Sequence, residues 1–141
     1  AVRQLLERET MRAFHQQTPP TVVMVELASF DDIEREYGAP AADALLAELS
    51  RALGSVVRAY DTIGRAGEKQ FLVILPNADQ AKAQGIMAKL RRACSLLMFM
   101  PKDEIVEISV RLGSDTADFR TRTPEPASMI EAATRNMSET F

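Results

Sequence analysis

The sequence predicts an α/β fold in which helices cover both faces of a central mixed sheet of about five strands. Short apolar runs of strand length alternate with longer segments whose apolar residues recur every three to four positions. Two of the short runs are separated only by a tight turn, which is typical of a β-hairpin. With 141 residues, the chain has the length of one domain and can bury a substantial core.

The first part of the chain is expected to form a helix, a strand and two further helices. A helical pattern covers Val2 to Gln16, and the β-branched run from Thr21 to Leu27 suits a central buried strand. Phe30 to Tyr37 has the pattern of a short acidic helix that ends at Gly38. Pro40 suits the first turn of the next helix, which is expected to reach about Arg58.

The stretch from Arg58 to Leu75 is the part around which the remaining elements are placed. It contains a short strand, a tight turn at Gly67-Glu68-Lys69 and an apolar run from Phe71 to Leu75. This order predicts a β-hairpin that carries a site at its turn.

After the hairpin, the sequence predicts a helix, a strand, a polar loop and a final helix. Asn77 and Gln80 have the spacing of a capping box, and the helix they open is expected to reach about Leu97. A strand is expected from Ile105 to Leu112, a loop over residues 114–125, and a helix from Pro126 to about Glu139. The inward side chains of the helix before this strand are expected to be Ile86, Leu90, Cys94 and Leu97.

Composition excludes several classes of function. The formal net charge of −3 and the two tyrosines with no tryptophan argue against a nucleic-acid-binding module of similar element order. No apolar run is long enough to span a membrane, and no signal peptide is visible. Cys94 and His15 are the only residues of their kinds, so a disulfide within the chain and a Cys/His metal cluster are excluded.

Two adjacent motifs resemble the signature of the GGDEF (diguanylate cyclase) family. Arg58-Ala59-Tyr60-Asp61 precedes the hairpin turn in the position of the family's R-x-x-D, and Gly67-Glu68-Lys69-Gln70-Phe71 stands where the family has G-G-D/E-E-F. The resemblance runs from Val22 to Leu97, with a looser tail to about Met137. It also includes Phe30, Tyr37, Gly38, Asp43, Leu46 and the pair Leu75-Pro76. It implies the family's fold, with the whole chain 1–141 as a single domain and a fragment of a larger multidomain regulator.

The resemblance also implies a catalytic site that has lost its chemistry. Active members hold a divalent cation between an acid on the first strand and an acid in the hairpin, and phosphoryl transfer needs that cation. Here the strand acid is Glu26, but Lys69 and Gln70 replace the two hairpin acids, and Glu68 replaces the glycine after Gly67. We expect no metal, no cofactor and no cyclase activity. We also expect an ion pair between Glu26 and Lys69 in place of the metal.

Substrate-binding positions have changed as well. The family lysine that meets phosphate is Asp31 here, and the asparagine that reads guanine is Glu34, although its partner Asp43 is retained. These changes add negative charge where a nucleoside triphosphate would bind.

The R-x-x-D motif is retained, and in the family this site binds cyclic di-GMP. The resemblance assigns binding roles to Arg58 and Asp61, with Lys89 in the place of a further family arginine. An arginine fork suits phosphate or the acceptor edge of guanine. An alternative interpretation is structural: Asp61 starts a strand, and Arg58 is a cation favoured by a helix end.

The sequence therefore predicts a catalytically inactive GGDEF domain that acts as a cyclic di-GMP receptor and signals through protein contacts. The alternative is a nucleotide-free scaffold or dimerisation module with the same fold. Expected partners are cyclic di-GMP and a protein or adjacent regulatory domain, with a homodimer as one assembly and neither nucleic acid nor membrane. As in the family at large, a bacterial cytoplasmic location is expected.

Overall fold

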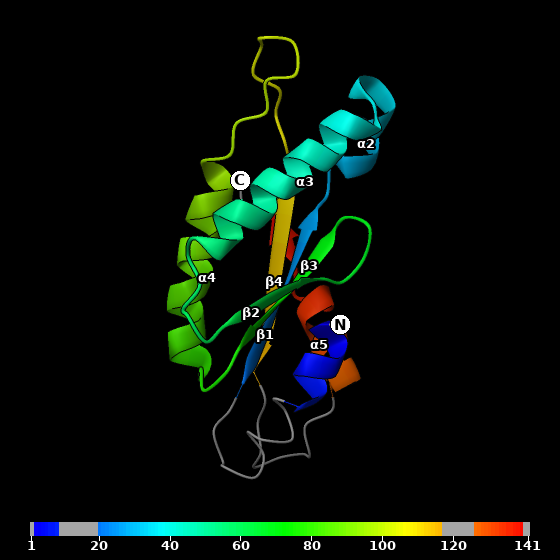
Figure 1. The fold of residues 1–141 in the computed structure, drawn as a ribbon. Coiled ribbons are helices and arrows are strands. Elements are labelled where there is room, and N and C mark those ends of the chain that lie inside the picture. Colours follow the sequence, from blue (N-terminus) through cyan, green and yellow to red (C-terminus); the bar gives the residue numbers. More distant parts are fainter. Residues whose placement is uncertain (1, 9–19, 117–125, 140–141) are drawn as a thin grey trace.

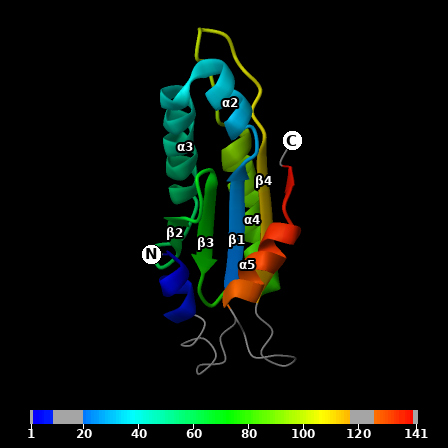
Figure 2. The same cartoon turned by 90° about the vertical axis from the view of Figure 1, so that its right-hand side faces the viewer.

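The computed structural model describes residues 2–8, 20–116 and 126–139, and these form a sheet of five strands in the order β2-β3-β1-β4-β5. The strands are β1 (Thr21–Leu27), β2 (Thr62–Arg65), β3 (Gln70–Leu75), β4 (Val110–Thr116) and β5 (Ser138–Glu139). Helices lie against both sides of the sheet (Figures 1 and 2). The predicted α/β sandwich is confirmed.

The prediction of a mixed sheet is wrong, because every pairing between the described strands is antiparallel. β2 runs in the same direction as β1, but the returning strand of the hairpin, β3, lies between them. In the same way, β3 and β4 run in one direction but lie on either side of β1, so no two parallel strands become neighbours.

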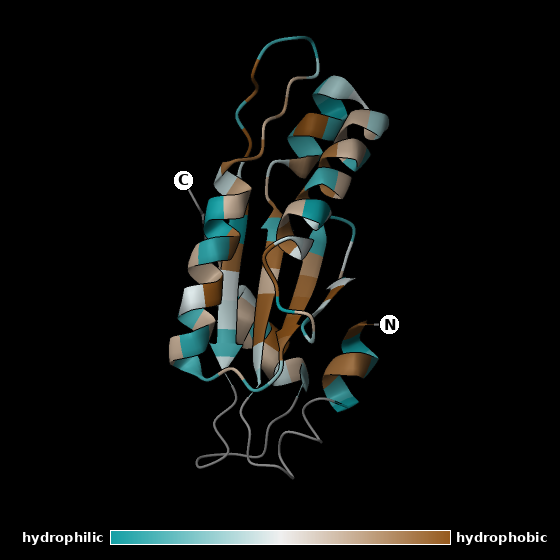
Figure 3. Cartoon of the chain, turned by 60° about the vertical axis from the view of Figure 1, so that its left-hand side comes forward, coloured by the Kyte–Doolittle hydropathy of each residue, from teal (hydrophilic) through white to brown (hydrophobic). Residues whose placement is uncertain are grey.

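Three helices cover one face of the sheet: α2 (Phe30–Tyr37), α3 (Ala39–Gly54) and α4 (Gln80–Ser95). The other face is covered by α5 (Pro126–Arg135) and by the N-terminal helical segment, residues 2–8. Apolar residues concentrate on the central strands in Figure 3. In the described part of the chain, no helix has both the length and the apolar content that a membrane span needs.

Side-chain alternation along β1 and β3 creates two separate cores. Val23, Val25 and Val73 point toward α2, α3 and α4, whereas Met24 and Leu72 point toward α5. Both strands are therefore apolar at nearly every position, as predicted for buried central strands.

Several boundaries differ from the sequence prediction. Helix α3 ends at Gly54, before Arg58. The predicted cap at Asn77 is wrong: Asn77 takes a positive φ of 51°, and Asp79 caps α4 by accepting a 2.9 Å hydrogen bond from the backbone N–H of Lys82. On α4, Leu90 and Cys94 are buried as predicted, while Ile86 is half-buried, as is Leu97 just beyond the helix.

The end of the chain also differs. β4 begins at Val110, because the preceding apolar residues form an isolated bridge between Phe99 and Val106 instead of extending the strand. α5 ends at Arg135, and the chain then adds the short strand β5. Of the predicted loop, residues 114–116 belong to β4, while residues 117–125 lie outside the described residues, as do His15 and the rest of 9–19.

Gly113 allows α5 to lie directly on β4. A Cβ atom at this position would stand 2.2 Å from the carbonyl oxygen of Ala133 and 2.4 Å from the backbone nitrogen of Met137. Both neighbours are backbone atoms, so no rotamer change can relieve the clash.

Candidate functional site

The predicted turn at Gly67-Glu68-Lys69 joins β2 to β3, and Arg65 holds it in place. The Arg65 guanidinium donates to the carbonyls of Gly67 at 3.2 Å and Glu68 at 2.5 Å. It also lies 5.6 Å from the ring centroid of Phe71. The turn is therefore fixed by a cation on its own hairpin.

Lys69 is paired with Asp31 across the gap between the turn and the first turn of α2. Lys69 Nζ donates to Asp31 Oδ2 at 3.0 Å, and these contacts raise the pKa of Lys69, chiefly through this hydrogen bond. Lysine therefore stays an ammonium at neutral pH, with its nearest carboxylate on α2.

The predicted ion pair between Glu26 and Lys69 is wrong. Gln70 is the cross-strand partner of Glu26, and its side-chain amide donates to Glu26 Oε1 at 3.0 Å. Arg111, the partner on β4, places Nη1 3.8 Å from Glu26 Oε2. Alternation explains the difference: Glu26 and Gln70 point to the α5 face, so the preceding residue, Lys69, points to the α2 face.

The remaining positions expected around a nucleotide lie on α2 and α3. Glu34 is half-buried on α2, and Asp43 is exposed on α3. Among the described residues, no three His, Cys, Asp or Glu side chains come together in a group that could hold a metal ion. The donor set beside Glu26 is an amide and a guanidinium, which do not suit a hard divalent cation.

Arg58 and Asp61 form a closed clasp at the start of β2. The Arg58 side chain donates from Nε to both Asp61 carboxylate oxygens, at 3.1 and 3.0 Å, and from Nη2 to Oδ1 at 2.8 Å. The Arg58 backbone N–H also donates to Oδ2 at 2.6 Å. The Asp61 side chain is 0% exposed and that of Arg58 is 24% exposed.

Two further contacts orient the Arg58 guanidinium. Its Nη2 donates to the carbonyl of Pro76 at 3.1 Å, and its central carbon lies 4.5 Å from the centroid of the Tyr60 ring. The pKa of Arg58 is raised, mainly by the hydrogen bond to Asp61. Sequence reasoning paired Arg58 with Asp61 but missed Pro76 and Tyr60, and only the exposed aromatic within the motif hinted at the stacking.

The structure places Lys89 at a cavity that it shares with residues shortly before Arg58 in the chain. Lys89 and Arg92 of α4 line a cavity of about 430 Å³ together with Ser55 and Val56, which lead toward Arg58. Arg92 adds a second cation to the position predicted for Lys89. The spacing of Lys89 and Arg92, three residues apart on one helix, could have indicated this shared face.

Comparison with known proteins places these features in a family context. Residues 1–140 match the family described as "Diguanylate cyclase, GGDEF domain". Among curated relatives, "Diguanylate cyclase A" of Treponema denticola is 24% identical over 119 residues, which are 84% of this chain and 32% of that protein. The chain thus spans about a third of that relative's length.

Solved structures share the fold at low sequence identity. Diguanylate cyclase SiaD of Pseudomonas aeruginosa, solved with its activator SiaC, has a TM-score of 0.87 at 21% identity, covering 96% of this chain and 51% of that one. The GGDEF domain of DgcB of Caulobacter crescentus, solved with c-di-GMP, has a TM-score of 0.84 at 18% identity, covering 94% and 77%.

Proposed function

Because this chain belongs to the GGDEF (diguanylate cyclase) domain family, we propose that it is a catalytically inactive member that binds cyclic di-GMP at the Arg58 site and signals through protein contacts. In this proposal it acts in the bacterial cytoplasm, within a larger regulator, and uses no metal or other cofactor.

The ion pair between Lys69 and Asp31 is the observation that carries the inactive assignment. An ammonium stands where the resemblance expects a metal-binding acid, and a carboxylate stands where it expects a phosphate-binding lysine. Both charges are inverted relative to what a magnesium nucleoside triphosphate requires. Glu26, the acid that remains, is already hydrogen-bonded to Gln70 and close to Arg111.

The receptor assignment is supported by the cations grouped near the retained motif. Arg58 is oriented by Asp61 and Tyr60, and Lys89 and Arg92 face a cavity beside the residues that lead to it. Guanidinium and ammonium groups suit phosphodiester oxygens, and arginine can also stack on a base. DgcB was solved with c-di-GMP and SiaD with a protein activator, so both partner types have precedents among proteins of this fold.

Calorimetric titration with cyclic di-GMP tests the receptor assignment. The variant Lys89→Glu/Arg92→Glu is preferred because both residues are exposed, so the change leaves the buried Arg58–Asp61 hydrogen bonds intact and loss of binding will not reflect unfolding. We expect the wild type to bind and this variant to lose at least about tenfold in affinity, since two phosphate-binding cations become anions. Lys82→Glu, on the same helix, is the matched control and should bind like the wild type.

Three outcomes contradict parts of the proposal. Absence of binding by the wild type at tens of micromolar, or equal binding by Lys89→Glu/Arg92→Glu, would remove the receptor role. Magnesium-dependent conversion of GTP to cyclic di-GMP by the wild type would remove the inactive assignment.

A nucleotide-free scaffold is the second candidate, and the burial of Asp61 favours it. Its carboxylate is fully enclosed and already accepts four hydrogen bonds from Arg58, so guanine would have to displace Arg58 to reach it. A wild type that fails to bind cyclic di-GMP but retains a stable fold would favour this role.

A further inference from the structure

The segment between α4 and β4 exposes a cluster of large apolar side chains. The exposed fractions are 69% for Leu96, 61% for Met98, 48% for Met100 and 69% for Ile105. Elsewhere in the described chain, only Leu5 and Tyr60 are large apolar residues of comparable exposure. Leu96 lines the cavity of Lys89 and Arg92, whereas Met98 and Met100 line a second cavity, and exposed apolar side chains at a cavity are typical of a contact surface.

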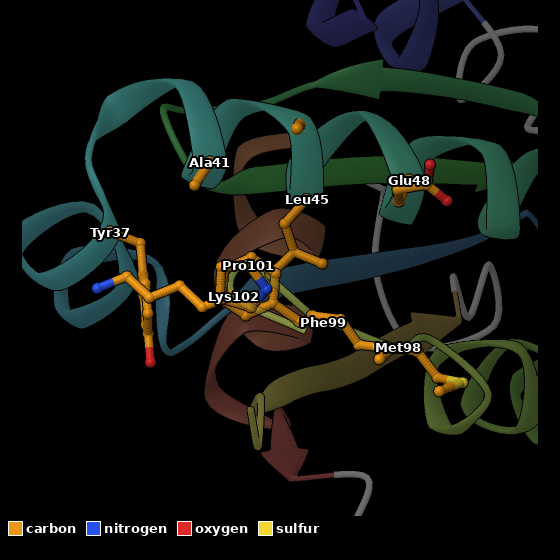
Figure 4. A pocket seen from close by; sticks show the side chains of 10 residues that line it. Tyr37, Ala41, Leu45, Glu48, Met98, Phe99, Pro101 and Lys102 are labelled. Carbon is orange, nitrogen blue, oxygen red and sulfur yellow. The ribbon is translucent and has the colours of Figure 1, made fainter. Parts of the chain in front are cut away.

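Met98 and Met100 stand beside a cavity of about 300 Å³ that opens between this segment and α3 (Figure 4). We define the methionine groove by its main lining residues, Tyr37, Leu45, Met98, Phe99, Met100 and Lys102. The buried ring of Phe99 meets the ring of Tyr37 edge to face, with centroids 5.4 Å apart. This aromatic pair gives the groove a preorganised floor, while flexible, polarisable methionines form an adaptable rim.

Helix α3 forms one wall of the groove. Its α3 residues are Ala41, Ala44, Leu45 and Glu48, which follow an i, i+3, i+4, i+7 stripe, and Tyr37 at the end of α2 adjoins them. A wall of about two turns matches the i, i+3/i+4, i+7 anchors that an amphipathic helix presents to a groove.

The surroundings of the groove carry more acids than bases. α2, which ends at Tyr37, has four acids and one arginine; Asp32 is paired with that arginine and Asp31 with Lys69. Arg51 is paired with Glu48. Within the described residues, three acids that adjoin lining residues in the chain have no ion-pair partner: Glu36 before Tyr37, and Asp103 and Glu104 after Lys102. The one cation in the lining, Lys102, lies 5.9 Å from the Tyr37 ring centroid.

We propose that the methionine groove binds an amphipathic helix of a protein partner, with apolar anchors in the groove and lysine or arginine residues toward the acidic rim. A second copy of this chain would bring a like-charged rim against the first, which disfavours it as the occupant. The inference depends only on this groove, so it stands whether or not cyclic di-GMP binds near Arg58.

Fluorescence anisotropy with a labelled synthetic helix of leucine and lysine tests the proposal. The leucines are placed at i, i+3, i+4 and i+7, and a matched peptide carries glutamate in place of every lysine. We expect the wild-type chain to bind the lysine peptide at least about tenfold more tightly than the glutamate peptide.

Variants of the chain separate apolar from charge contributions. Met98→Glu should weaken binding of the lysine peptide at least about tenfold, although the added negative charge alone would strengthen it. Leu5→Glu, on the opposite face, makes the same change away from the groove and should not weaken binding. Lys102→Gln should tighten binding and Glu104→Gln should weaken it, each by roughly two- to threefold.

Three results would overturn the proposal. The first is equal binding of the lysine and glutamate peptides. The second is equal loss with Met98→Glu and Leu5→Glu. The third is self-association of the wild type in sedimentation that Met98→Glu abolishes, which would make a second copy the occupant.

Discussion

The GGDEF resemblance expects an acid at position 69 and a lysine at position 31, whereas this chain has Lys69 and Asp31. The two side chains still carry opposite charges and form an ion pair. Such a pair can be reversed without losing its attraction. The remaining acid, Glu26, is hydrogen-bonded to Gln70 on the opposite face of the sheet, and its charge raises the pKa of Lys69 less than Asp31 does.

We predict that Asp31→Lys and Lys69→Glu each destabilise the fold by about 0.5–1 kcal/mol, because each places like charges together. The double variant should recover most of this loss, since the two positions again carry opposite charges, with their signs exchanged. Urea unfolding of the wild type, the two single variants and the double variant measures these changes in stability. A double variant whose loss is the sum of the two single losses would show that the pair is not coupled.

The Arg58–Asp61 clasp should matter more to stability than any surface pair. Arg58→Ala leaves a fully buried carboxylate without its cation, so we expect a loss of about 3–5 kcal/mol in the free energy of unfolding. Arg35→Ala, which removes an exposed i,i+3 pair, is the control and should cost less than about 0.5 kcal/mol. Similar losses in the two variants would contradict the burial of the clasp.

The Cys94 thiol should make the free energy of unfolding depend on pH in alkaline solution. Burial raises the pKa of its thiol from 9.0 to about 11, with the positive charge of Arg91 opposing the shift. Above pH 9 the unfolded state loses the proton first, so stability should fall between pH 9 and 11 by roughly 2–3 kcal/mol. Cys94→Ala should be less stable than the wild type at neutral pH, because removing the sulfur leaves a cavity. In alkaline unfolding titrations it should lack the part of the decline in stability that comes from thiol ionisation.

At the scale of elements, the contact of α5 with β4 depends on Gly113. We predict that Gly113→Ala destabilises the fold by about 1–3 kcal/mol, because the new methyl group meets backbone of α5. Gly85→Ala is the matched control: apart from its chain neighbours and the backbone of its own helix, no atom lies within 4 Å of its Cβ position in α4, so it should stabilise by about 0.5–1 kcal/mol. Thermal unfolding measures the change in stability of both variants. A change of the same sign in the two variants would contradict the close packing of α5 on β4.

The elements that sequence predicted best are those bounded by strong local signals. Helix α2 has its predicted bounds because Gly38 adopts a φ of 94° after it and Pro40 starts the next helix. β4 was misplaced because the Ile105–Val106 stretch has strand character but folds back on Phe99. That contact depends on the placement of a turn, which local propensity does not determine.

The candidate site was predictable in its residues but not in its pairings. Arg58 and Asp61 are three residues apart, so their contact follows from local geometry. The partners of Glu26 depend on strand register, which placed Gln70 and Arg111 beside it and turned Lys69 away. The register depends on how the side chains of neighbouring strands pack on both faces of the sheet, so it cannot be read from one segment alone.

At the scale of the whole molecule, charge is divided between the helices of one face. α2 has four acids and one arginine, whereas α4 has four cations and no acid. The net charge of −3 conceals this separation. The two proposed binding surfaces follow this separation of charge. The acidic rim of the methionine groove beside α2 suits a basic helix, and the cations of α4 suit a phosphodiester.

The enclosure of Asp61 has a consequence for kinetics. If guanine must replace Arg58, the Arg58–Asp61 hydrogen bonds have to break before the ligand can reach the carboxylate. The rate at which they break then sets an upper limit on the observed association rate. In stopped-flow mixing with cyclic di-GMP, the observed rate should level off at high ligand concentration. A rate that rises linearly throughout would mean that the dinucleotide docks on the exterior and leaves the carboxylate undisturbed.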